Sequence, residues 1–101
     1  MAVAVNFEIP GGTQEQYEEV SRRAFGSAHG PSEPIPGLII HTAGATGDGW
    51  RVFDVWESKD AFMSFMEETM MPATEGMDMP QNEPEIYELH NMVGATMAQT
   101  T

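Results

Sequence analysis

The stretch that decides the fold is GLIIHTAGATGDGWRVFDVWE, residues 37–57. Both of its ends have the composition and alternation of β-strands, and its central TGDG is typical of a tight turn. We therefore predict a β-hairpin with strands over 37–45 and 50–57. Counting outward from the turn pairs His41 with Asp54, close enough for the two side chains to interact. The same register forms three further pairs: Ala45 with Trp50, Ala43 with Val52, and Ile39 with Trp56.

A strand and a helix are predicted before the hairpin. Residues 3–9 alternate apolar and polar side chains, which is a strand pattern. Thr13 and Gln16 have the spacing of a capping box, which begins a helix. This helix carries Tyr17 on its apolar face and should end before Gly30, where a loop rich in Gly, Pro and Ser leads to the hairpin.

A second helix and a last strand are predicted after the hairpin. Ser58 caps the helix, and Pro72 ends or kinks it. Residues 85–93 are predicted as the strand that closes a domain over 1–93, and 94–101 as a frayed tail. The order βαββαβ with short right-handed connections predicts an α+β, ferredoxin-like fold. In that fold a four-stranded antiparallel sheet carries both helices on one face.

Strand alternation divides the sheet residues into two faces. We expect the helices to cover the more apolar one: Val3, Val5, Phe7, Ile9, Leu38, Ile40, Phe53, Val55, Tyr87, Leu89 and Val93. The other face would carry Ala4, Asn6, Glu8, Ile39, His41, Ala43, Trp50, Val52, Asp54, Trp56, Ile86, Glu88, His90 and Met92. Because an uncovered apolar patch usually marks an interface, we predict a homodimer whose sheets pack face to face around a cavity.

The composition excludes several classes of partner. The formal net charge is −12, and only four residues are Lys or Arg, so nucleic acid and anionic membranes are not expected partners. The chain has no Cys, which excludes disulfides and thiolate metal sites. The N-terminus lacks the pattern of a signal peptide, and no stretch is long and apolar enough to cross a bilayer. We therefore expect a cytoplasmic protein.

Residues 49–62 and the order of the elements resemble the dimeric α/β-barrel superfamily, and within it the antibiotic-biosynthesis-monooxygenase-like (ABM-like) proteins. The recurrent part begins with a strand that ends in Trp56 and with Ser58 two positions later. After two further residues, Ala61 and Phe62 open the second helix. The resemblance extends over residues 2–93 and implies a barrel formed by two chains. Family members include cofactor-independent monooxygenases acting on polycyclic phenols, haem-degrading enzymes, and decarboxylases or cyclases.

Two branches of the family can be compared residue by residue. The haem-degrading branch uses an Asn on the first strand, a Trp in the second helix and a His near that helix's end. Asn6 is comparable with the first, but Phe65 stands where the Trp would be and residues 67–78 contain no His. The quinone-forming branch uses an Asn and a Trp four residues apart, and the comparable pair here is Val52 and Trp56. The resemblance therefore implies no bound haem and leaves the Asn of the oxygenases unmatched.

His41 and Asp54 are the candidate catalytic pair. A carboxylate beside an imidazole fixes its tautomer and increases its basicity, as in many general bases. The alternative is a polar cross-strand pair on a half-solvated sheet. His90, near Glu88 on the same expected face, is a second candidate acid or base. These four side chains are also of metal-ligand type, but no close-spaced ligand motif is present, so we expect no metal and no cofactor.

The candidate ligand-binding residues come from the same expected face: Asn6, Glu8, Trp50, Trp56 and Glu88. For Asn6 and Glu8 the alternative is a hydrogen bond at the dimer interface, and for the two Trp residues it is packing in the core or at an interface. The first hypothesis is a small cofactor-independent monooxygenase-like enzyme acting on an aromatic or polyketide-like molecule, with His41 as general base. Two alternatives remain, a non-catalytic protein that binds a hydrophobic small molecule and an oxygen-independent cyclase, lyase or isomerase.

Overall fold

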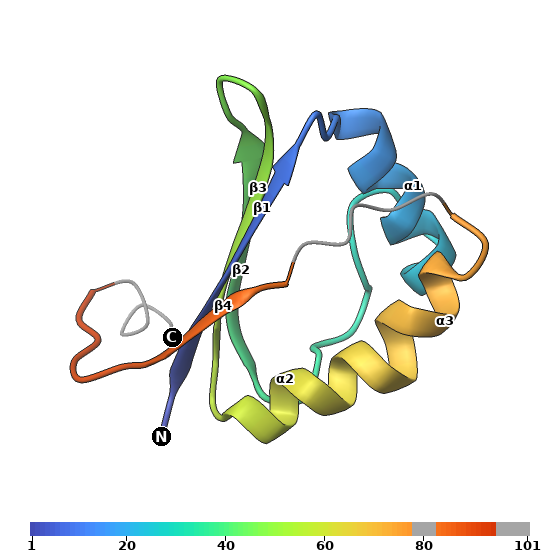
Figure 1. Cartoon of the computed structure of the whole chain (residues 1–101). Coiled ribbons are helices and arrows are strands. Elements are labelled where there is room, and N and C mark those ends of the chain that lie inside the picture. Colours follow the sequence, from blue (N-terminus) through green and yellow to red (C-terminus); the bar gives the residue numbers. More distant parts are fainter. Residues whose placement is uncertain (78–82, 95–101) are drawn as a thin grey trace.

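The computed structural model, which describes residues 1–77 and 83–94, has the predicted α+β ferredoxin-like fold, with the helices on one side of an antiparallel sheet (Figure 1). Its elements are β1 (Val3–Pro10), α1 (Gln14–Phe25), β2 (Leu38–Ala45), β3 (Gly49–Trp56), α2 (Lys59–Phe65), the π-helical turn η1 (Met66–Met70), α3 (Met71–Thr74) and β4 (Glu85–Glu88). The strand order is β2-β3-β1-β4. Residues 95–101 of the predicted tail lie outside the described residues. No described helix is long and apolar enough to cross a membrane.

The hairpin of β2 and β3 has the predicted register near its turn and loses it farther away. Ala45 lies opposite Trp50, Ala43 opposite Val52 and His41 opposite Asp54, as predicted. The predicted pairing of Ile39 with Trp56 was wrong, because the register shifts between Leu38 and Ile40 and places Leu38 opposite Trp56. Such a bulge leaves one residue without a partner and bends the strand.

The predicted division of the sheet into two faces was wrong for β1 relative to the other strands. β1 pairs with β3 so that Val5 lies opposite Asp54, and directly opposed residues point to the same face. The face under the helices therefore carries Val3, Val5, Phe7, Ile9, Leu38, His41, Ala43, Ala45, Trp50, Val52, Asp54, Trp56, Ile86 and Glu88. The other face, called here the uncovered face, carries Ala4, Asn6, Glu8, Ile40, Thr42, Arg51, Phe53, Val55 and Tyr87. Alternation sorts residues within one strand, whereas the pairing of distant strands decides which sets share a face.

The hydrophobic core lies between the sheet and the second helix. Val3, Val5, Trp56 and Phe62 form its fully buried cluster. The ring of Trp56 meets that of Phe62 edge-on at 5.7 Å and that of Phe65 at 5.2 Å. Full burial of each such side chain stabilises the fold by roughly 1.5–3 kcal/mol. Phe62 and Phe65 of the second helix thus pack directly over the end of β3.

The second helix was predicted either to end or to kink at Pro72. It does not end there, because the helical path continues past this residue. Proline has no N–H to donate, and its ring would clash with the carbonyl four residues earlier in a regular α-helix. Here a π-helical turn comes just before it, with the N–H of Met71 bonded to the carbonyl of Met66. The wider turn admits Pro72 near the start of α3, and the helical path runs on to Thr74.

Helix α1 is held in place at both of its ends. Thr13 and Gln16 form the predicted capping box, with the Gln16 N–H donating to Thr13 Oγ1 at 3.1 Å and the Thr13 N–H to Gln16 Oε1 at 3.0 Å. Ser21 is buried, and its Oγ donates to the carbonyl of Ser27 and accepts from the N–H of Gly30. These bonds tie the following loop to the helix, so the buried face of α1 has a set position over the sheet.

Strand β4 is shorter than predicted. It ends at Glu88 rather than continuing to residue 93, although the N–H of Leu89 still bonds to the carbonyl of Ala2 at 2.9 Å. His90 therefore follows the strand, where it is exposed, and is not part of the sheet.

Candidate functional site

A cavity of about 580 Å³ lies between the helix-facing side of the sheet and the helices. Its walls are mainly apolar. The strands contribute Phe7, Ile9, Leu38, Ile39, Val52 and Trp56, and the helices contribute Val20, Phe25, Phe62, Phe65, Met66 and Met70. The lining from the described residues includes Glu33 and Asp54 but no Lys or Arg. Apolar walls with a few convergent polar groups are the usual make-up of a small-molecule site.

His41 and Asp54 are joined at the wall of this cavity. Nδ1 of His41 lies 2.7 Å from Oδ1 of Asp54, and the side chains are 38% and 10% exposed. The second carboxylate oxygen, Oδ2, accepts a hydrogen bond of 3.2 Å from Nε1 of Trp56, which is itself only 1% exposed. With Asp54 ionised, its oxygens only accept, so Nδ1 of His41 carries a hydrogen. The pair is therefore oriented by the core, through Trp56.

Tyr17, on helix α1, contacts the other ring nitrogen of His41. Its hydroxyl is hydrogen-bonded to Nε2 of His41, and the two rings are nearly parallel, with centroids 5.9 Å apart and planes 8° apart. The other neighbour of the phenol ring is the indole of Trp50, at 5.4 Å. Burial, and secondarily the negative charge of Asp54, raises the pKa of Tyr17 above its usual value. Tyr17, His41 and Asp54 thus form a hydrogen-bonded chain, called here the Tyr–His–Asp chain.

Sequence reasoning assigned Tyr17 only to the apolar face of the first helix. The signal that could have identified it is a hydroxyl-bearing ring on the same face as Val20 and Ser21, which are both buried. A buried phenol usually finds a hydrogen-bond partner. Its actual partner lies on another element, however, and only the packing of α1 over β2 shows which residue that is.

Trp50, a predicted ligand-binding residue, lies in the cavity lining with an unpaired donor. Its Nε1 is buried and has no hydrogen-bond partner among the described residues. A buried donor left unpaired costs about 1–3 kcal/mol. A ligand that supplied an acceptor here would recover part of that cost.

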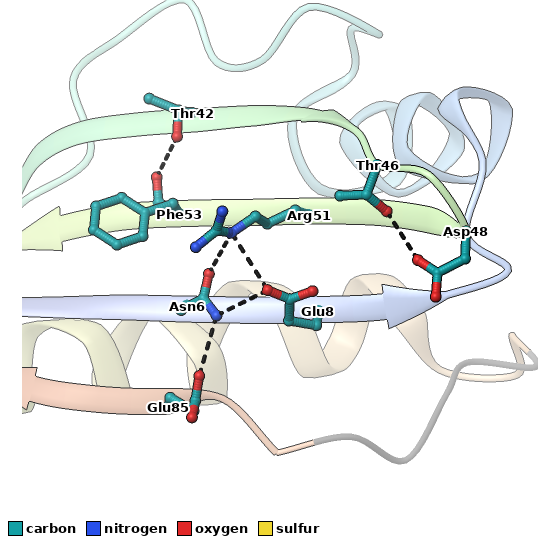
Figure 2. A network of polar contacts seen from close by, with 8 residues as sticks. All are labelled: Asn6, Glu8, Thr42, Thr46, Asp48, Arg51, Phe53 and Glu85. Carbon is teal, nitrogen blue, oxygen red and sulfur yellow. Dashed lines mark hydrogen bonds and ion pairs between the residues drawn. The ribbon is translucent and has the colours of Figure 1, made fainter.

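Asn6 and Glu8, also predicted to bind ligand, lie on the uncovered face, and neither lines the cavity (Figure 2). Nε of Arg51 donates to Oδ1 of Asn6 at 2.8 Å and lies 3.5 Å from Oε2 of Glu8. Nδ2 of Asn6 donates to Oε1 of Glu85 at 3.2 Å. The side chains form a polar network across three strands, separated from His41 by the sheet itself.

The remaining predicted site residues are also away from the cavity. Glu88 ends β4 and His90 follows it, both are exposed, and neither lines the cavity that holds His41 and Asp54. Within residues 1–77 and 83–94, no three His, Asp or Glu side chains gather into a group that could hold a metal ion. The structure therefore brings together His41, Asp54, Trp50 and Trp56 from the predicted set.

No protein-family model and no curated protein matches the chain. Several solved structures are similar to it, and two of them are described here. One is a mutant of SnoaB, a cofactor-independent oxygenase from Streptomyces nogalater, with a TM-score of 0.60, 19% sequence identity, and coverage of 93% of this chain and 97% of that chain. The other is a mutant of MhuD with two manganese protoporphyrin IX bound per active site, with a TM-score of 0.56, 19% identity, and coverage of 94% and 100%. The chain therefore has the fold of the ABM-like dimeric α/β-barrel proteins, the group that its sequence resembles.

Proposed function

We propose that the chain is a cofactor-independent monooxygenase-like enzyme that acts on an aromatic or polyketide-like small molecule, with His41 as general base. The observation that carries this proposal is the position of the His41 imidazole, which stands in an apolar cavity wall with Asp54 behind it at 2.7 Å. A carboxylate in that place stabilises the imidazolium formed when His41 accepts a proton. The likeness to SnoaB, a cofactor-independent oxygenase, supports the reaction type.

The reaction needs no redox cofactor, because the substrate itself supplies the electrons. A methylene group activated by two aromatic rings and a carbonyl, as in an anthrone, loses a proton that ends on His41. The carbanion reduces O₂ and binds it as a peroxide, which regains the proton from the imidazolium. Loss of water then leaves a carbonyl where the methylene was. One oxygen atom enters the product and the other leaves as water, so substrate and O₂ balance without a further reductant.

The lining of the cavity favours a neutral substrate. No Lys or Arg from the described residues is present to pair with a carboxylate or phosphate, and Glu33 and Asp54 would repel an anion. The aromatic and aliphatic walls suit flat fused rings. The unpaired Nε1 of Trp50 supplies one donor for a carbonyl or hydroxyl oxygen of such a ligand.

The residues present do not fit a porphyrin, the group bound to MhuD. Residues 59–74, which form the second helical segment, contain no His. Among the described residues, two His residues line the cavity: His29 lies exposed on the loop after α1, and His41 already uses both ring nitrogens. Asn6, the residue comparable with the haem-degrading branch, lies on the opposite face of the sheet. The proposed reaction therefore involves no haem.

Oxygen uptake by the purified, metal-free protein against anthrones, naphthols and hydroquinones tests the proposed function. We expect one of these neutral aromatics to be consumed with O₂ in a 1:1 ratio and without release of hydrogen peroxide. Turnover without O₂ would instead identify a cyclase, lyase or isomerase. Tight binding with no turnover would identify a binding protein. Either of these last two results would contradict the proposal.

We also propose that the chain forms a homodimer through the uncovered face. No described helix packs on this face, and its Ile40 and Tyr87 side chains are 43% and 48% exposed. The dimer face expected from the sequence shared Asn6 and Glu8 with the uncovered face, but it also included Trp50 and Trp56, which instead lie under the helices. We expect the sheet of a second chain to cover the uncovered face, as in the barrel implied by the family resemblance.

Replacing Ile40 with glutamate should convert the dimer into a monomer, because a charge would be buried between the sheets without a partner. Met63→Glu is the matched control, since Met63 is 42% exposed but lies on helix α2. Sedimentation velocity should show a dimer for the wild type and for Met63→Glu, and a monomer for Ile40→Glu. A monomeric wild type, or a dimeric Ile40→Glu variant, would contradict this interface.

A further inference from the structure

Both ring nitrogens of the proposed base are already occupied. Nδ1 of His41 is bonded to Asp54 at 2.7 Å, and Nε2 is bonded to the hydroxyl of Tyr17. A base can remove only a proton that comes within hydrogen-bonding distance of its free lone pair. In this arrangement, a substrate in the cavity has no direct access to either nitrogen of His41.

Tyr17 borders the cavity and occupies Nε2 of His41. Its side chain is half-buried and lines the cavity. Beyond the bond to Nε2, its oxygen makes no hydrogen bond with any of the described residues, so a lone pair remains for a donor from the substrate. Burial raises the pKa of Tyr17, which keeps the phenol protonated near neutral pH and able to donate to the neutral imidazole.

We propose that Tyr17 is a catalytic residue that relays the substrate proton to His41, an inference that rests on the proposed role of His41 as base. The O–H or C–H bond of the substrate breaks as its proton moves to the Tyr17 oxygen. At the same time the O–H bond of Tyr17 breaks, and its proton forms the Nε2–H bond of His41. Tyr17 begins and ends neutral, the substrate becomes an anion, and the imidazolium is stabilised by Asp54.

The packing favours a relay over a movement of Tyr17 out of the way. The phenol ring lies parallel to His41 and against Trp50, and the helix that carries it begins at the capping box of Thr13 and Gln16, one turn away. Swinging the side chain aside would break the bond to Nε2 and these ring contacts. A proton shift along existing hydrogen bonds requires no such rearrangement, and groups already positioned lower the barrier to transfer.

Proton transfer can be measured without oxygen chemistry. Under argon, 1,8-dihydroxyanthrone mixed with the protein in a stopped-flow instrument should form its coloured anion. In Tyr17→Phe, which keeps the ring, we expect anion formation to slow by about 10²-fold, the lower range for a positioned acid–base group. The dissociation constant from quenching of Trp fluorescence should stay within about twofold, because a single neutral hydrogen bond contributes modestly. The chain has one other Tyr, so Tyr87→Phe on the uncovered face is the matched control and should react as the wild type does.

The outcomes separate the relay from the proposed function. Slow anion formation in both Tyr17→Phe and His41→Ala, with unchanged binding and melting temperature in Tyr17→Phe, would support the relay. A wild-type rate in Tyr17→Phe together with a slow His41→Ala would overturn the relay, because His41 would then act directly, and the proposed function would stand. If the wild type bound the anthrone without forming the anion, both the relay and the role of His41 as base would be wrong.

Discussion

Replacing His41 with alanine should lower the rate of oxygen uptake by roughly 10²–10⁴-fold, the usual contribution of a positioned general base. The imidazole takes the substrate proton, and alanine provides no group at this position to accept it. The loss should appear in kcat rather than in KM, because the walls that bind the aromatic rings are unchanged. Steady-state oxygen uptake measured over a range of substrate concentrations separates the two constants.

Two companion variants sharpen this test. Asp54→Asn should also lose activity, though less than His41→Ala, because the amide cannot stabilise an imidazolium and must turn its NH₂ toward either His41 or Trp56. His90→Ala should retain wild-type activity, since His90 is exposed beyond the end of β4 and does not line the cavity. Full activity in His41→Ala would remove the Tyr–His–Asp chain from the mechanism, and a large loss in His90→Ala would show that a group outside the cavity lining takes part.

Replacing Trp56 with alanine should destabilise the fold by about 3–5 kcal/mol, as large-to-small changes of aromatic core residues do. Trp56 is 1% exposed and packs against Phe62 and Phe65. The change also leaves Oδ2 of Asp54 without its donor in a largely buried position. A domain of this size has a total free energy of unfolding of about 5–15 kcal/mol, so this loss is a large share of it. Urea unfolding followed by circular dichroism measures the difference.

Trp56→Phe is the control that separates packing from hydrogen bonding at this position. It keeps an aromatic ring in the core but removes the Nε1–H that donates to Asp54. We expect a smaller loss of stability, of about 1–3 kcal/mol, the cost of leaving one buried polar group unpaired. If Trp56→Ala were no less stable than Trp56→Phe, ring packing would not be the main contribution of this residue.

The features that sequence reasoning predicted well are local. The capping box of Thr13 and Gln16 is formed within four residues, and the pairing of His41 with Asp54 follows from counting outward from a tight turn. In both cases the chain between the partners is too short to allow many arrangements. The same counting failed at Ile39, because a bulge interrupts the ladder and no turn residue marks it.

The features that sequence reasoning missed depend on distant segments. The residues of β1 and β3 were correctly sorted into two sets within each strand, but whether Val5 shares a face with Asp54 or with Phe53 depends on how β1 pairs with β3. A shift of one residue in that pairing exchanges the faces. Both sets on β3 contain large apolar side chains, so hydrophobicity did not decide between them.

The sequence by itself determined the order of the elements, the ferredoxin-like class and the contact between His41 and Asp54, because turns, caps and alternation act over a few residues. Only the tertiary structure decided that this pair lies beneath the helices and that Asn6 lies on the uncovered face. It also decided that Tyr17 covers the second nitrogen of His41. These positions result from the register of β1 on β3 and the packing of α1 over the sheet, which depend on the burial of apolar surface by segments far apart in the chain.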